Sequence, residues 1–83
     1  MSKYPIGAEW AYIDIDGSRG SVWLDDINKN FEVWRWSYQN IDGSGHVFDW
    51  TTNKAAAVSE CKSAFRSERH KIRFKRVITP HTP

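Results

Sequence analysis

The stretch WAYIDIDGSRGSVWL, from Trp10 to Leu24, decides the fold, because two alternating runs of residues meet at a strong turn signal within it. Asp-Gly at positions 16–17 favours the positive φ angles of a tight hairpin turn. The two runs are therefore predicted to pair as antiparallel strands. A two-residue turn fixes the register so that Trp10 faces Trp23 across the hairpin.

In this register the two faces of the hairpin differ in character. Three aromatic rings, Trp10, Tyr12 and Trp23, share one face with a cross-strand pair formed by Asp14 and Arg19. Aliphatic side chains occupy the other face, which is the natural core: Ala11, Ile13, Ile15, Val22 and Leu24. We therefore expect the three rings to point away from the core.

The tetrapeptide Ile-Asp-Gly-Ser occurs at 15–18 and again at 41–44, which predicts a second hairpin turn. An even register over the second Asp-Gly pair puts the aromatic residues of 34–38 and those of 47–51 on opposite faces. A register shifted by one residue pairs Tyr38 with Phe48 and Trp36 with Trp50. The shifted register is preferred, because rings buried together on one face contribute several kcal/mol.

Beyond the second hairpin the pattern changes from alternation to helical spacing. Thr51, Thr52 or Asn53 can cap a helix that runs to about Arg69. Its apolar stripe is made of Ala57, Val58, Cys61, Ala64 and Phe65. After His70 the alternation returns and predicts a short strand in which Arg73 and Lys75 share one side and Arg76 takes the other.

The predicted fold class is α+β, in the order β-β-β-β-α-β. It is a four-stranded antiparallel β-meander of two Asp-Gly hairpins, with one long α-helix packed on one face and a short basic C-terminal edge strand. The chain of 83 residues is short enough for one domain. We expect that domain to span 1–78 and to be followed by a flexible C-terminal tail, 79–83.

Charge is sorted along the chain. Residues 1–50 hold eight acidic and four basic side chains, a net of −4, whereas residues 62–76 hold seven basic side chains against Glu68 alone, a net of +6. The formal net charge of +2 therefore hides a dipolar molecule. The basic run can attract a polyanion, or it can keep the protein soluble and its strand edge unpaired.

Composition argues against several classes of protein. Cys61 is the only cysteine, so no intramolecular disulfide can form, and the three histidines are too scattered for a zinc site. No apolar stretch approaches the ~20 residues of a membrane span, and the N-terminus lacks a signal-peptide core. No catalytic acid–base pair or activated nucleophile converges. We therefore expect a cytoplasmic, non-enzymatic protein without a metal or cofactor.

Two features of the sequence can bind a partner. The three rings Trp10, Tyr12 and Trp23, rimmed by Arg19 and Arg35, can stack on the bases of single-stranded nucleic acid or anchor a protein. They can also be covered by residues 4–6 or by a second copy of the chain, which would make a homodimer. Basic side chains near the C-terminus can contact phosphates: Arg66, Arg69, Lys71, Arg73 and Lys75.

These features predict a small binding protein, with nucleic acid or a nucleic-acid-handling complex as the favoured partner. In that interpretation the cations neutralise phosphates while the rings stack on bases. The alternative is a small protein-binding regulator or inhibitor, of the kind that mobile elements encode, which docks through the aromatic patch. DNA and RNA are equally open as targets.

Overall fold

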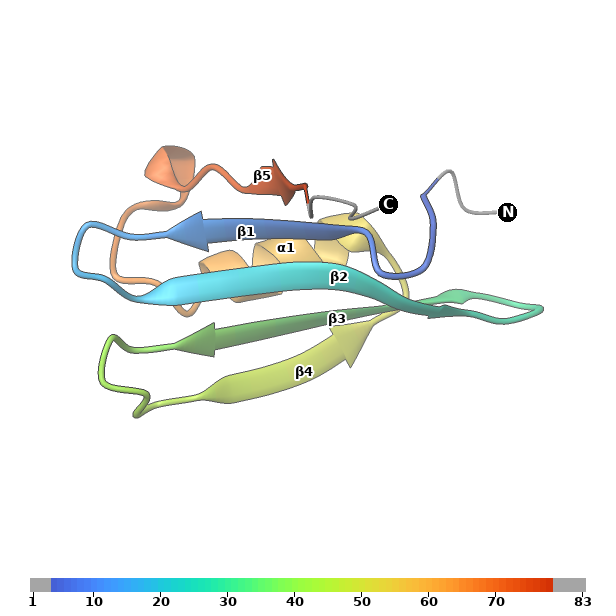
Figure 1. Cartoon of the computed structure of the whole chain (residues 1–83), viewed down its shortest axis with the longest axis horizontal. Helices are drawn as coiled ribbons and strands as arrows, with labels where there is room; N and C mark the ends of the chain where they lie inside the picture. The colour runs from blue at the N-terminus through green and yellow to red at the C-terminus, as the bar shows by residue number, and fades with distance from the viewer. Residues whose placement is uncertain (1–3, 79–83) are drawn as a thin grey trace, which may run out of the picture.

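One helix packs against a five-stranded antiparallel sheet in the computed structural model, which describes residues 4–78 (Figure 1). The strands lie in the order β4-β3-β2-β1-β5. The elements are β1 (Glu9–Ile13), β2 (Arg19–Ile27), β3 (Glu32–Gln39), β4 (Val47–Thr51), α1 (Lys54–Lys62), the 3-10 helix η1 (Arg69–Lys71) and β5 (Lys75–Val77). The predicted α+β class and element order are confirmed. The predicted tail at 79–83 lies outside the described residues.

The first hairpin turn has three residues in its loop instead of the predicted two. The Asp14 N–H donates to the Ser18 carbonyl (2.8 Å), and the Gly17 N–H donates to the Asp14 carbonyl (2.9 Å). Gly17 has a φ of +88°, a left-handed conformation that glycine adopts without steric strain. The turn is therefore a type I turn followed by a left-handed glycine, which is a common three-residue hairpin loop.

The second hairpin turn repeats this conformation. The Asn40 N–H donates to the Ser44 carbonyl (3.1 Å), and the Gly43 N–H donates to the Asn40 carbonyl (2.9 Å). Asp42 Oδ1 accepts hydrogen bonds from the N–H and the hydroxyl of Ser44. The repeated tetrapeptide thus encodes one turn conformation twice, and both predicted turn positions are confirmed.

The longer loop shifts the first hairpin by one residue from the predicted register. Trp10 lies opposite Val22, and Arg19 lies opposite Ile13 rather than Asp14. A shift of one residue turns every side chain of a strand to the other face of the sheet. The predicted register is therefore wrong, and so is the cross-strand pair of Asp14 and Arg19.

The shift reverses which side chains of β1 reach the core. Trp10 and Tyr12 point toward α1, on the same face as Val22 and Leu24, and the alternate residues of β1 point away. Ile13 is consequently 64% exposed. Of the five aliphatic side chains predicted to form the core of this hairpin, only Val22 and Leu24 are buried.

The second hairpin carries one extra residue on its return strand. Its turn pairs Asn40 with Ser44, but the strands pair Tyr38 with Val47. The two pairs are therefore two residues apart before the turn, from Tyr38 to Asn40, but three residues apart after it, from Ser44 to Val47. Gly45, with a φ of +63°, lies in the longer segment and allows the bulge.

The preferred register of the second hairpin is wrong for this reason. Phe48 lies opposite Ser37, and Trp50 lies opposite Arg35. Residues that face each other across paired strands share a face of the sheet. The rings of β4 therefore point away from the rings of β3, as they would in the even register.

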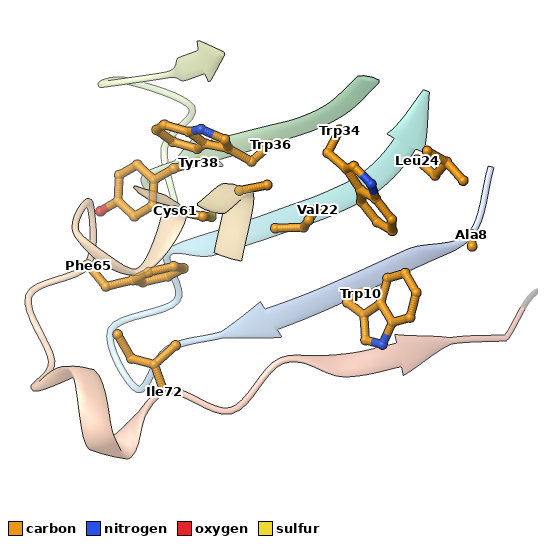
Figure 2. Packing of buried hydrophobic residues seen from close by; sticks show 11 residues of the cluster. Ala8, Trp10, Val22, Leu24, Trp34, Trp36, Tyr38, Cys61, Phe65 and Ile72 are labelled. Atoms are coloured by element: carbon orange, nitrogen blue, oxygen red, sulfur yellow. The ribbon is translucent and has the colours of Figure 1, made fainter. Parts of the chain in front are cut away.

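The core lies between α1 and the rings of β3 (Figure 2). Trp34 is only 1% exposed, and its Nε1 donates to Glu32 Oε1 (2.8 Å). From α1 the predicted apolar stripe contributes Ala57 and Cys61, and Phe65 follows just beyond the helix. The stripe is thus confirmed as the surface that packs on the sheet.

The helix is shorter than predicted. It begins after Asn53, whose Oδ1 accepts a hydrogen bond from the Ala56 N–H (2.8 Å), and it ends at Lys62 rather than near Arg69. The Arg69 guanidinium instead donates to the Ser59 carbonyl (3.1 Å) and to the Ser63 hydroxyl (2.8 Å). The chain beyond α1 is therefore folded back against the end of the helix.

The basic strand β5 forms an edge of the sheet, as predicted, and pairs with β1. Lys75 lies opposite Ala11 and Arg76 lies opposite Trp10, which confirms that these two cations point to opposite faces. The Arg76 guanidinium lies 4.8 Å from the centroid of the Trp10 ring, and Lys54 Nζ lies 3.8 Å from it. These cation–π contacts attach both β5 and the start of α1 to the core.

Asp14 is a buried carboxylate that joins the first hairpin to the segment after α1. It is 5% exposed, and its Oδ1 accepts from the Tyr12 hydroxyl (3.0 Å), the Ile15 N–H (2.8 Å) and the Ser67 hydroxyl (2.7 Å). Burial by itself raises the pKa of this carboxyl, but the hydrogen bonds together hold the pKa below its ordinary value of 3.8.

The lowered pKa predicts that Asp14 stabilises the fold at neutral pH and loses this effect in acid. Its contribution is complete above the pKa of the unfolded chain and disappears as the pH falls through the folded-state value. Asp14→Asn should lower the free energy of unfolding by about 1–3 kcal/mol at neutral pH. Urea unfolding should then show a smaller loss on acidification below about pH 4 for the variant than for the wild type.

Asp49→Asn is the matched control, because Asp49 is exposed and, among residues 4–78, its side chain accepts only from the adjacent Trp50 N–H. It should leave the acid sensitivity of the wild type intact. Equal acid sensitivity in the wild type and Asp14→Asn would contradict the role of Asp14.

Candidate binding surface

The face of the sheet opposite α1, called the open face below, carries a group of aromatic rings. The ring cluster consists of Trp23, Phe31, Phe48 and Trp50. Trp23 and Phe48 have centroids 5.7 Å apart, and Phe31 stacks on Trp50 at 6.5 Å. Phe48 and Trp50 are 55% and 49% exposed. Rings of this size usually lie in a core or an interface, so their exposure makes this face a candidate contact surface.

Arg35 lies among these rings on the open face. Its Nε donates to Asp25 Oδ2 at 2.9 Å, and its guanidinium lies 5.6 Å from the centroid of Phe48. Both partners of the ion pair are about one-third exposed, so the pair is screened by water and contributes little to stability. Its effect is to keep the Arg35 side chain beside the ring of Phe48.

A shallow hollow that we call the cationic depression lies at the β1–β5 side of the sheet. Its volume is about 370 Å³, and it is lined by Ala11, Tyr12, Ile13, Arg19, Arg73 and Lys75. Its three cations make no ion pair or side-chain hydrogen bond with another residue in 4–78. No carboxylate lines the hollow. Three converging, uncompensated positive charges produce a local potential that favours an anion.

Two of the rings predicted to form the contact surface are not on it. Trp10 is only 8% exposed and packs in the core. Tyr12 is half-buried, with its ring 5.2 Å from that of Phe65 and its hydroxyl bound to Asp14. The predicted patch of Trp10, Tyr12 and Trp23 is therefore wrong as an exposed surface. The one-residue shift in the first hairpin separated Trp23 from the other two.

The predicted basic surface is divided among several places. Arg73 and Lys75 join Arg19 in the cationic depression. Arg69 is bound to the end of α1, and Lys71 lies 3.8 Å from Glu68. The remaining predicted cation, Arg66, is exposed beyond α1. These residues are close in sequence, but they lie apart in the structure because Arg69 and Lys71 interact with other partners.

The sequence did not point to Phe31, Phe48 or Trp50 as surface residues. The only local signal for the rings of β4 was Gly45. The extra residue in the bulge at this glycine decides to which face of the sheet those rings point. Glycine within an otherwise alternating segment indicates a bulge. The glycine alone does not specify how many residues the bulge inserts.

The described residues contain little that resembles a reactive centre. Burial raises the pKa of the Cys61 thiol to about 12, and the thiolate is the nucleophilic form, so this thiol is inert at neutral pH. Within residues 4–78 no three His, Cys, Asp or Glu side chains are placed to hold a metal ion. The same residues contain no helix with the length and apolar character needed to cross a membrane.

Comparisons of the chain with protein-family models, with curated protein sequences and with solved structures found no match.

Proposed function

We propose that this chain is a non-enzymatic binding protein that holds single-stranded nucleic acid on the open face. The observation that supports the proposal is the presence, on one face of a sheet, of exposed rings and uncompensated cations. In this proposal Trp23, Phe48 and Trp50 stack on bases, while the cations of the cationic depression contact phosphates.

The energies of such contacts suit a surface of this kind. Each base stacked on an aromatic side chain contributes roughly 1–3 kcal/mol. The sheet provides rigid positions for the rings, since each lies on a paired strand except Phe31. A basic groove beside aromatic platforms is the usual arrangement of proteins that bind single strands without strict sequence preference.

A salt titration tests this function. Binding of a labelled oligonucleotide of about 12 nucleotides, as DNA and as RNA, is followed by fluorescence anisotropy from about 25 to 200 mM salt. Three phosphate contacts on a single strand predict a log–log slope of about −2. The double variant Arg73→Gln/Lys75→Gln should make the slope shallower by about 1.4. No binding of either oligonucleotide at the lowest salt concentration would contradict the proposal.

Lys71→Gln is the matched control for this titration. Lys71 is an exposed cation near the same part of the sequence, but it does not line the cationic depression. Its replacement should leave the salt slope within about 0.3 of the wild-type value. An equal change in slope for Lys71→Gln would assign the effect to general positive charge and not to the depression.

The ring cluster also supports a protein partner as a second candidate. Phe31 is 42% exposed just before β3, where it stacks on Trp50, beyond the acidic residue Asp25. It extends the apolar area away from the cationic depression, and aromatic residues dominate protein interface hot spots. A protein bound there would be retained at high salt, and an excess of oligonucleotide would not displace it.

A further inference from the structure

The arrangement of the two parts of the open face also defines a path for the ligand. We infer that a bound single strand crosses the sheet at right angles to the β-strands, with bases on the ring cluster and phosphate in the cationic depression. This inference rests on the proposed function. It further specifies which part of the ligand lies at each end of the surface.

The strand register places the two ends in line. Successive pairing partners form one row across the open face, made of Lys75, Ala11, Ser21, Ser37 and Phe48. The neighbouring row is made of Val77, Glu9, Trp23, Arg35 and Trp50. Each row therefore begins at β5, near the cations, and ends at β4 with an exposed ring. A ligand that touches both Lys75 on β5 and an exposed ring on β4 must therefore cross β1, β2 and β3.

Charge favours the first row as the route of the phosphate backbone. Glu9 stands in the neighbouring row, between β5 and Trp23, and would repel a phosphate there. The row from Lys75 to Phe48 has no acidic side chain along it. A second hollow of about 360 Å³, lined by Gly7, Glu9, Ser21, Trp23 and Ser37, lies in the middle of the face, and its one carboxylate disfavours a phosphate there while leaving room for a base. The middle of the route thus offers space next to a ring.

The length of the route sets the size of the ligand. Adjacent strands are ~4.8 Å apart, so the four steps from β5 to β4 span ~19 Å. A stacked strand rises ~3.4 Å per nucleotide, so about six stacked nucleotides, or fewer extended ones, cover this distance. A mononucleotide cannot reach both ends. A duplex is also a poor ligand, because its bases stack on one another and cannot lie flat on protein rings.

Half-abasic oligonucleotides test the path. The probes are oligothymidylates of about six nucleotides, either intact or lacking the bases of the 5′ half or of the 3′ half. The cationic end requires only phosphates, whereas the ring end requires bases. One half-abasic probe should therefore bind within about 3-fold of the intact probe, and the other should lose about 5- to 150-fold. Equal losses for both probes would overturn the path, since both halves of the strand would then depend on stacked bases.

One variant keeps the test of the path separate from the test of the proposed function. Trp50→Ala should weaken the intact probe about 5- to 150-fold without changing its salt slope. It should have little effect on the probe that lacks bases at the ring end. If Trp50→Ala weakens both half-abasic probes by the same factor, the path is wrong although nucleic-acid binding is retained. If the intact probe does not bind at all, the proposed function itself fails.

Discussion

Replacing Trp10 by alanine should remove a large part of the stability of the protein, whereas the same change at Trp23 should cost much less. Trp10 is 8% exposed, and its ring centroid lies 4.8 Å from that of Tyr4 and 5.8 Å from that of Trp34. Removing a buried tryptophan side chain costs roughly 3–5 kcal/mol. That is comparable to the total stability of a domain of this size, which is roughly 4–12 kcal/mol.

Trp23 is the matched control, because it lies on the adjacent strand but points to the open face. It is half-buried and has no residue of α1 above it. Trp23→Ala should cost about 1–2 kcal/mol, since part of its surface is already in water. Urea unfolding followed by circular dichroism would compare the two variants with the wild type. A larger loss for Trp23→Ala than for Trp10→Ala would contradict the assignment of the two faces.

Replacing Gly20 by alanine should destabilise the protein although the added group is a single methyl. Gly20 lies on β2 beneath α1, and a Cβ at this position would be 2.8 Å from Cys61 Sγ and 2.8 Å from Phe65 Cζ. Both atoms belong to buried side chains, so neither can move freely into solvent. Overpacking of this kind costs about 1–3 kcal/mol. Thermal unfolding should show a melting temperature lowered by roughly 5–20 °C.

A double-mutant cycle separates overpacking from a change in strand propensity. Cys61→Ala removes one of the two contacting atoms, so Gly20→Ala should cost less in the Cys61→Ala background than in the wild type. Ser21→Ala, next to Gly20 but on the open face, should change stability by less than about 0.5 kcal/mol. If Gly20→Ala costs the same in both backgrounds, the close approach of α1 to β2 is not the cause.

The structure keeps Arg73 and Lys75 together but separates Trp10 from Trp23, because the two predictions depended on different properties of the chain. Arg73 and Lys75 were predicted to share one side of a strand, and alternation along an extended segment is a local property, although Arg73 lies just before β5 and outside it. Both residues line the cationic depression. The aromatic patch instead required that Trp10 and Trp23, on two different strands, share a face. That depends on the register, which one residue in a turn can reverse.

The amino-acid sequence alone determined the positions of both hairpin turns, the apolar stripe of α1, the basic edge strand and the order of all elements. These features depend on neighbours along the chain: Asp-Gly dipeptides, 3–4 spacing and alternation. Only the tertiary structure decided which rings are buried. The same tetrapeptide gives the same turn twice, yet Gly45 adds one residue to the second hairpin alone. Packing of α1 over Gly20 then covers the face that carries Trp10 and Trp34, because the registers of β1 with β2 and of β2 with β3 place both rings on that face.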